Sequence, residues 1–134
     1  MISHHDALIY TMVLVSAADR DMSDAELQTI GRMVNHLPAF KDFDEDALPL
    51  VAADCAKVLA HEDGLDRTLD MILSALPEHL RETCYAIACD VAAADGHVVN
   101  EEVRLLQLLR EKLDLDRLIA AAIERGARAR HQTA

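Results

Sequence analysis

Aromatic residues, glycine and proline are all scarce in this chain of 134 residues. Tryptophan is absent, only 3% of the residues are aromatic, and there are four glycines and three prolines. No stretch shows the period-two alternation of apolar and polar residues that marks a half-buried strand, whereas alanine and leucine are abundant. This composition favours an all-α fold. The length suits one compact domain covering 1–134, with a buried core.

Long hydrophobic runs and positive charge are also missing. No window approaches the roughly 18 consecutive apolar residues of a membrane-spanning helix, so we expect no direct membrane insertion. The first residues lack the basic, apolar and small-residue segments of a secretory signal, which favours a cytoplasmic location. The net charge of −11 argues against a nucleic-acid partner, which requires a basic face. It fits a cation or a basic protein partner.

The motifs of common enzyme classes are absent as well. There is no glycine-rich phosphate loop, no His-Glu-x-x-His motif and no cysteine with a histidine partner in a known pattern. Carboxylate pairs could support hydrolysis, but the low aromatic content argues against a sugar-binding cleft. We therefore predict that the chain is not an enzyme. Cys55, Cys84 and Cys89 fit no metal or redox motif, and we expect them to be small apolar core residues.

The sequence does contain an internal duplication of a unit made of a helix, an acidic elbow and a second helix. The two units cover about 5–38 and 81–114, and a shift of 76 positions superposes them. The elbows run over 19–26 and 95–102, so that each begins with an Asp and has a Glu seven residues later. Two helices without a copy lie between the units, and a closing helix follows.

Apolar periodicity predicts about seven helices. They are expected at about 4–18, 23–37, 48–61, 65–76, 78–94, 100–112 and from 114 or 116 to 126. The first is apolar nearly all round, so it should be central. The small side chains of 92–94 should let the fifth helix approach the first closely. The last helix is expected to bury Leu118, Ile119, Ala122 and Ile123, and 128–134 to be frayed.

The acidic elbows have a structural interpretation that must be weighed first. Residues 23–26 fit a capping box, in which Ser23 and Glu26 satisfy amides at the start of a helix. Glu102 could do the same in the second copy. Capping does not explain Asp19 and Asp95, since a carboxylate at a helix C-terminus is unfavourable by a few tenths to about 1 kcal/mol. The alternative for these two is that Asp simply favours helix-ending turns.

A bound cation would compensate for that unfavourable placement. Carboxylates and helix C-terminal carbonyls are the oxygen ligands that hard divalent cations prefer. The spacing differs from an EF-hand, because the Glu comes at the eighth position and not the twelfth. Ca²⁺, Mg²⁺ and Mn²⁺ are the candidate ions, with Zn²⁺ if His97 contributes. The candidate ligands are Asp19, Asp21, Glu26, Asp95, Glu101 and Glu102.

Three motifs carry a resemblance to a known family. They are Ser16-Ala17-Ala18-Asp19 followed by Met22-Ser23-x-x-Glu26, Ala75-Leu76-Pro77-x-x-Leu80-Arg81, and Val91-Ala92-Ala93-Ala94-Asp95-Gly96-x-Val98-x-x-Glu101-Glu102. In this order they resemble the tellurite-resistance TerB family. The resemblance implies a compact helical fold and divalent-metal binding, usually of Ca²⁺, by acids that fall on Asp19, Glu26, Asp95 and Glu102. It also implies a cytoplasmic role in tellurite and stress resistance beside a membrane partner.

One position departs from the family pattern. Arg20 stands where the family prefers glycine, as Gly96 does in the second copy. Arg20 brings positive charge to the first elbow and could replace the ion, so we predict tighter binding at the second. The leading hypothesis is a non-enzymatic cation-binding module that acts through a protein partner, peripheral to the inner membrane. The alternatives are a metal-independent interaction domain that docks a basic or membrane-protein partner by its acidic face, and a metal-dependent hydrolase.

Overall fold

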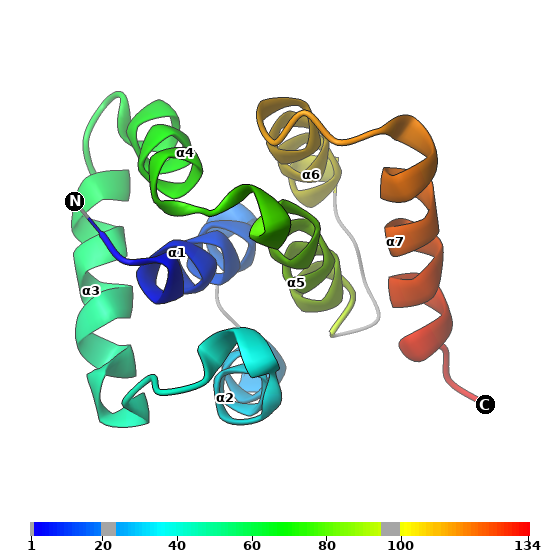
Figure 1. The fold of residues 1–134 in the computed structure, drawn as a ribbon, viewed down its shortest axis with the longest axis horizontal. Helices are drawn as coiled ribbons and strands as arrows, with labels where there is room; N and C mark the ends of the chain where they lie inside the picture. Colours follow the sequence, from blue (N-terminus) through cyan, green and yellow to red (C-terminus); the bar gives the residue numbers. More distant parts are fainter. Residues whose placement is uncertain (1, 20–23, 95–99) are drawn as a thin grey trace.

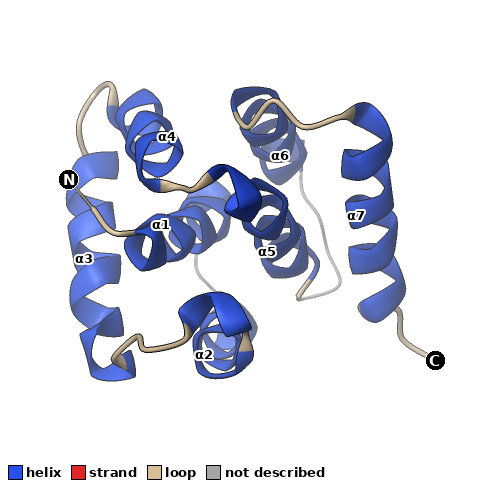
Figure 2. Cartoon of the chain, in the orientation of Figure 1, coloured by secondary structure: helices blue, strands red, loops and turns tan. Residues whose placement is uncertain are grey.

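The computed structural model describes residues 2–19, 24–94 and 100–134, with the backbone alone considered at 19 and 24–27. Over these ranges it is all-α, without strands, which confirms the predicted fold class (Figures 1 and 2). The helices are α1 (His4–Ser16), α2 (Asp24–His36), α3 (Leu48–Leu59), α4 (Gly64–Ala75), α5 (Arg81–Ala93), α6 (Asn100–Lys112) and α7 (Arg117–Arg130). Short 3-10 turns are η1 (Ala17–Asp19), η2 (Pro38–Phe40), η3 (Glu45–Ala47) and η4 (Glu78–Leu80).

Helix α1 is the centre of the molecule, as its sequence predicts. Ser3 caps it, because the Ser3 hydroxyl accepts from the Asp6 amide at 3.0 Å and the Asp6 carboxylate faces the Ser3 amide in a capping box. Every residue from Ala7 to Ser16 is buried. Helices α3, α4 and α5 pack around it (Figure 1). An apolar helix with no polar face can be stable in water only when neighbours cover it on all sides.

The two repeat units meet through α1 and α5. Cys84 of α5 approaches Thr11 of α1, with 3.2 Å between Sγ and Oγ1. Because Thr11 donates its own proton to the Ala7 carbonyl at 2.8 Å, the thiol is the donor in this pair. Burial raises the pKa of Cys84 to about 12, so the thiol stays protonated at neutral pH. A polar contact this close requires small side chains between the helices.

The face of α5 that packs on α1 is not the one predicted from its alanines. Cys84, Ala88 and Val91 are fully buried and are spaced four and three residues apart, which is one side of a helix. Ala93 is instead half-buried and lines a groove that faces α6 and α7. Each residue rotates the helix by about 100°, so consecutive alanines cannot share one interface. The fully buried alanine on the same side of α5 as Cys84 is Ala88.

The cysteines behave as predicted. Cys55, Cys84 and Cys89 are all buried and unbridged. Burial raises the pKa of Cys55 and of Cys89 to about 12 as well. Thiols that remain protonated at neutral pH are poor nucleophiles and poor metal ligands, which fits a packing role.

Helix α7 extends further than predicted. It passes through Gly126 and continues to Arg130, whose guanidinium contacts the Asp90 carboxylate of α5 at 2.7 Å. This ion pair anchors a segment that was expected to be frayed. The start of the helix agrees with the sequence, because Asp116 caps it by accepting from the amides of Leu118 and Ile119.

The buried face of α7 also differs from the prediction. Ala120 and Ala127 are its buried residues, whereas Leu118 is 81% exposed, Ile119 is 38% exposed and Ala122 is exposed. The helix packs on α5 (Figure 1), its buried residues are small, and the large apolar residues of its first turn stay exposed. A hydrophobic pattern alone does not say where a neighbouring helix ends.

The other boundaries differ from prediction by a few residues at most. Helix α6 has the predicted bounds, while α1 ends at Ser16 and continues as η1. Pro38 begins η2, and Pro77 precedes η4, so each proline starts a 3-10 turn after a helix has ended. Proline fits these positions because its fixed φ suits a first turn that needs no amide donor.

Gly64 and Gly31 should respond to alanine in opposite directions. A Cβ on Gly64 would lie 2.6 Å from the carbonyl oxygens of Val58 and Leu59, whereas a Cβ on Gly31 meets nothing within 4 Å. We expect Gly64→Ala to lower the free energy of unfolding by roughly 1–2 kcal/mol, since the first turn of α4 must shift. Gly31→Ala in the middle of α2 should raise it by about 0.5–1 kcal/mol. Urea denaturation of both variants checks this, and a stable Gly64→Ala protein would contradict the close approach.

Candidate metal centre

The first elbow begins where α1 ends in a tight turn. The Ala17 amide bonds back to the carbonyls of Val13 and Val15, and η1 carries the chain on to Asp19. No basic residue stands in the last turn of α1. The terminal carbonyls and the negative end of the helix dipole are therefore not compensated by a cationic side chain within that turn. The backbone of Asp19 lies at the helix end, as predicted.

The helices on either side of the second elbow, α5 and α6, are both described. The Ala94 amide closes the last turn of α5 by donating to the Val91 carbonyl at 3.2 Å. Glu101 is exposed in the first turn of α6, whereas Glu102 beside it is only 3% exposed. Burial of a carboxylate costs free energy unless polar partners or an opposite charge compensate it. Glu102 does have an interaction partner. The α6 N-terminus also favours negative charge there.

The two elbows are connected by the packing of the repeats. Turn η1 of the first unit packs against α6 of the second, and α2 of the first unit packs against α5 of the second. Ala17 and Ala18 share a groove of about 430 Å³ with Glu101 and Arg104. The end of one unit's first helix thus lies beside the start of the other unit's second helix.

The predicted ligands are described to different extents. Asp21 and Asp95 lie outside the described residues, as do Arg20 and Gly96, so their arrangement stays a prediction. Asp19 in η1 and Glu26 in the first turn of α2 are placed by their backbones. Glu101 and Glu102 are placed fully, side by side at the start of α6.

The oxygen chemistry around η1 suits a hard cation. The Ser16 hydroxyl is buried at the end of α1 and has no hydrogen-bond partner among the described residues. It comes directly before the turn that carries Asp19, beside helix-terminal carbonyls. Within 2–19, 24–94 and 100–134, no three His, Cys, Asp or Glu side chains cluster as a metal site. Any ligand set must therefore include elbow side chains beyond those ranges or backbone oxygens.

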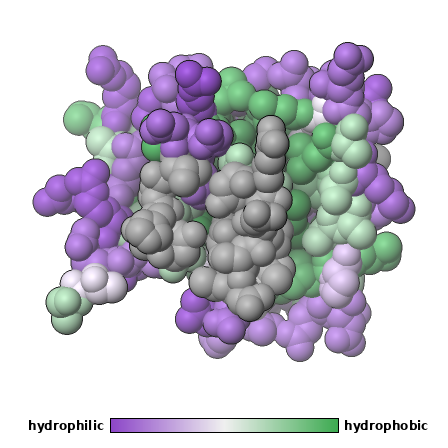
Figure 3. All heavy atoms as spheres, turned by 180° about the vertical axis from the view of Figure 1, so that it is seen from behind, coloured by the Kyte–Doolittle hydropathy of each residue, from purple (hydrophilic) through white to green (hydrophobic). Residues whose placement is uncertain are grey.

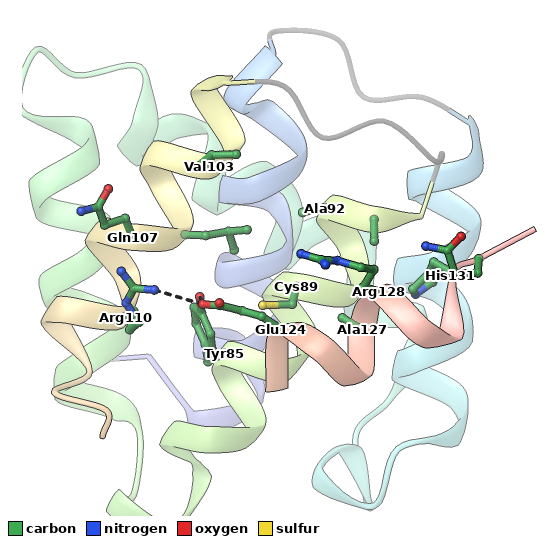
Figure 4. Close-up of a pocket in the computed structure, with 13 residues that line it drawn as sticks. Tyr85, Cys89, Ala92, Val103, Gln107, Arg110, Glu124, Ala127, Arg128 and His131 are labelled. Carbon is green, nitrogen blue, oxygen red and sulfur yellow. Dashed lines mark hydrogen bonds and ion pairs between the residues drawn. The ribbon is translucent and has the colours of Figure 1, made fainter. Parts of the chain in front are cut away.

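A polar network between α5, α6 and α7 was not anticipated from the sequence. The Tyr85 hydroxyl donates to Glu124 at 2.5 Å, and Arg110 donates to the same carboxylate oxygen at 3.1 Å (Figure 4). Burial and the neighbouring Glu124 raise the pKa of Tyr85, so the phenol remains a donor at any physiological pH. The three residues are 14 to 39 positions apart and match no motif. The single buried tyrosine on an otherwise apolar stretch of α5 was the available signal.

The chain shows no membrane-crossing element in its described part: none of those helices combines sufficient length with sufficient apolar character. No curated protein and no solved structure matches the chain significantly. The family model described as tellurite resistance protein TerB matches residues 5–125. This match includes both repeat units and the helices between them, and the chain therefore belongs to the TerB family.

Proposed function

We propose that this protein is a non-enzymatic module that binds divalent cations at its acidic elbows and acts in tellurite and stress resistance through a protein partner. The observation that carries the proposal is the packing of η1, which ends at Asp19, against α6, whose first turn carries Glu101 and the buried Glu102. Under this proposal the carboxylates of the two repeat units would act together. Membership of the TerB family supports the resistance role.

The residues proposed to hold the ion are those selected from the sequence. Asp19 and Asp21 would serve the first elbow with Glu26, and Asp95 would serve the second with Glu101 and Glu102. Ca²⁺ is the expected ion, because flexible sites of carboxylate and carbonyl oxygens suit it better than the strict octahedron of Mg²⁺. A bound ion would neutralise the excess negative charge and fix the two elbows relative to each other.

The partner is proposed to be a membrane protein of the resistance system. The module would then work in the cytoplasm, peripherally at the inner membrane. Its acidity, with a net charge of −11, favours a basic cytoplasmic segment as the docking surface.

A metal-independent interaction domain is the second candidate, and the groove beside η1 favours it. Its walls are apolar side chains of Leu14, Leu105 and Leu108, while Glu101 stands at its edge. Leu65 from α4 also lines it and is 41% exposed. Hydrophobic surface is visible on this side of the molecule, seen from behind in Figure 3. Such a surface could hold a partner helix by its apolar face without any ion.

Calorimetric titration of the full chain with Ca²⁺, Mg²⁺, Mn²⁺ and Zn²⁺ separates the two functions. The cation-binding proposal expects saturable heat with at least one ion, with Ca²⁺ favoured. Flat traces for all four ions would remove it and leave the interaction domain.

The two elbows should not bind equally. Arg20 puts a positive charge into the first elbow, whereas Gly96 leaves the backbone of the second free to approach an ion. We expect Asp95→Asn to abolish the tighter of two binding events and Asp19→Asn to affect the weaker one. Titration of each variant with Ca²⁺ measures this. The reverse pattern, with the tight event lost only in Asp19→Asn, would show that the first elbow is the stronger site.

A further inference from the structure

A second recess lies on the opposite side of α5 from α1. It has a volume of about 490 Å³ and is enclosed by α5, α6 and α7 (Figure 4). This is the size of many small-molecule sites. Glu101 and Glu102, the two predicted cation ligands whose side chains the structure describes, do not line it. We call it the α5–α7 groove.

The groove exists because α7 packs on α5 and scarcely on α6. The Arg110–Glu124 ion pair spans the gap between α6 and α7 at one end of the groove. The rest of the groove is open because its lining residues there are small: Ala92 and Ala93 from α5 and Ala127 from α7. Larger side chains at these positions would fill the groove and become part of the hydrophobic core.

The walls of the groove are mainly apolar. Leu106 and Val103 line it from α6, and Val103 is 51% exposed. Cys89 and the alanines of α5 form the opposite wall. An apolar chain or ring placed here would be removed from water, and burying it is favourable in proportion to its area.

Among the described residues that line the groove, one arginine has no charged partner. Glu124 is compensated by Arg110 and by the Tyr85 hydroxyl. Arg128 makes no hydrogen bond or ion pair with any residue in the described ranges, and its guanidinium points into the groove between the walls (Figure 4). Guanidinium groups bind carboxylates by paired, charge-assisted hydrogen bonds.

We propose that the α5–α7 groove binds an apolar monocarboxylate. The hydrocarbon part would occupy the space beside Ala93 and Leu106, and the carboxylate would pair with Arg128. The Tyr85–Glu124–Arg110 network closes one end, and its hydrogen-bonding groups engage one another. The ligand would therefore be held by one ion pair with Arg128 and by burial of its hydrocarbon part.

Octanoate and octanol are suitable probes because they share the chain and differ in charge. Each is titrated calorimetrically into the full protein in the presence of chelator, so that cation binding plays no part. We expect saturable binding of octanoate, with octanol weaker by about tenfold through loss of one charge-assisted pair. Arg128→Gln should bring octanoate down to the affinity of octanol. Arg125→Gln is the matched control, since Arg125 is exposed on the same helix and does not line the groove.

A second variant tests the apolar part independently of charge. Ala93→Leu adds a side chain that occupies the groove, and it should abolish binding of both probes while thermal unfolding stays close to wild type. Absence of saturable octanoate binding would overturn the proposal, as would equal affinities for the two probes or an equal loss in Arg125→Gln. A wild-type dimer in size-exclusion chromatography that both Arg128→Gln and Ala93→Leu convert to monomer would also overturn it, because a second copy would then be the occupant.

Discussion

The double variant Asp19→Asn/Asp95→Asn is expected to melt at or above wild type in chelator and below wild type in saturating Ca²⁺. Both residues follow helix C-termini in the repeat units, where the end of α1 has no basic residue in its last turn. A carboxylate is unfavourable there without an ion, so its removal should be neutral or stabilising. An ion that binds only the folded chain stabilises it by about 2.7 kcal/mol at a hundredfold excess over Kd. For a domain of this size that is a shift in Tm of roughly 10 °C.

If the order of the melting temperatures of variant and wild type reverses between the two buffers, Asp19 and Asp95 act as ligands of the ion. A residue that only shapes the turn would cause the same loss of Tm with and without ion, and this result would remove the cation proposal for Asp19 and Asp95. Glu26→Gln is a useful comparison, because glutamine can still serve a capping box. The Tm of this variant should therefore fall little in chelator and more in Ca²⁺. Differential scanning calorimetry in the two buffers measures all of these variants.

Much of the fold follows from sequence because its helices have clear patterns and stops. Helix α6 has the predicted bounds, since its stripe of leucines follows an acidic first turn and ends in basic residues. The central position of α1 follows from its lack of a polar face, which only burial on all sides can satisfy. The prolines and the Asp63-Gly64 break divide the middle of the chain as expected.

The orientation of α7 could not be obtained in the same way. Leu118, a large apolar residue in its first turn, is 81% exposed, while Ala120 and Ala127 are buried. Which face of α7 is buried depends on where α5 ends and on how closely small side chains allow the two helices to approach. Neither can be derived from the sequence of α7 alone. The Arg130–Asp90 ion pair joins residues 40 positions apart, so a pattern read along the chain could not anticipate the ordered end of α7.

The location of the candidate centre stays a prediction from the sequence, whereas the packing around it could not be predicted in the same way. Repetition of the acidic elbow indicated the region, and the unfavourable placement of Asp19 and Asp95 suggested a cation. The packing of η1 on α6 could not be predicted from the sequence, because it joins an element of the first repeat unit to an element of the second. Glu102 is deeply buried while Glu101 beside it is exposed, a difference that depends on the surrounding packing and not on the two residues themselves. The two glutamates are equivalent in sequence but should not be equivalent in function.

Ala88→Leu should be among the most destabilising single substitutions in this protein. Ala88 is 0% exposed and lies between Cys84 and Val91 on the face of α5 that packs on α1. Added carbon atoms have no space there, and moving α5 would disturb the Thr11–Cys84 contact of 3.2 Å. We expect a loss of about 3 kcal/mol in the free energy of unfolding, the upper part of the range for overpacked cores.

Ala93→Leu is the matched control, with the same change of residue on the same helix. Ala93 is half-buried and faces the α5–α7 groove, where a larger side chain has room. Its free energy of unfolding should stay within about 0.5 kcal/mol of wild type, as for substitutions outside the packed core. Urea denaturation of the two variants side by side decides the matter. Equal losses would mean that the groove is closed in solution, and a tolerated Ala88→Leu would mean that α1 and α5 are not closely packed.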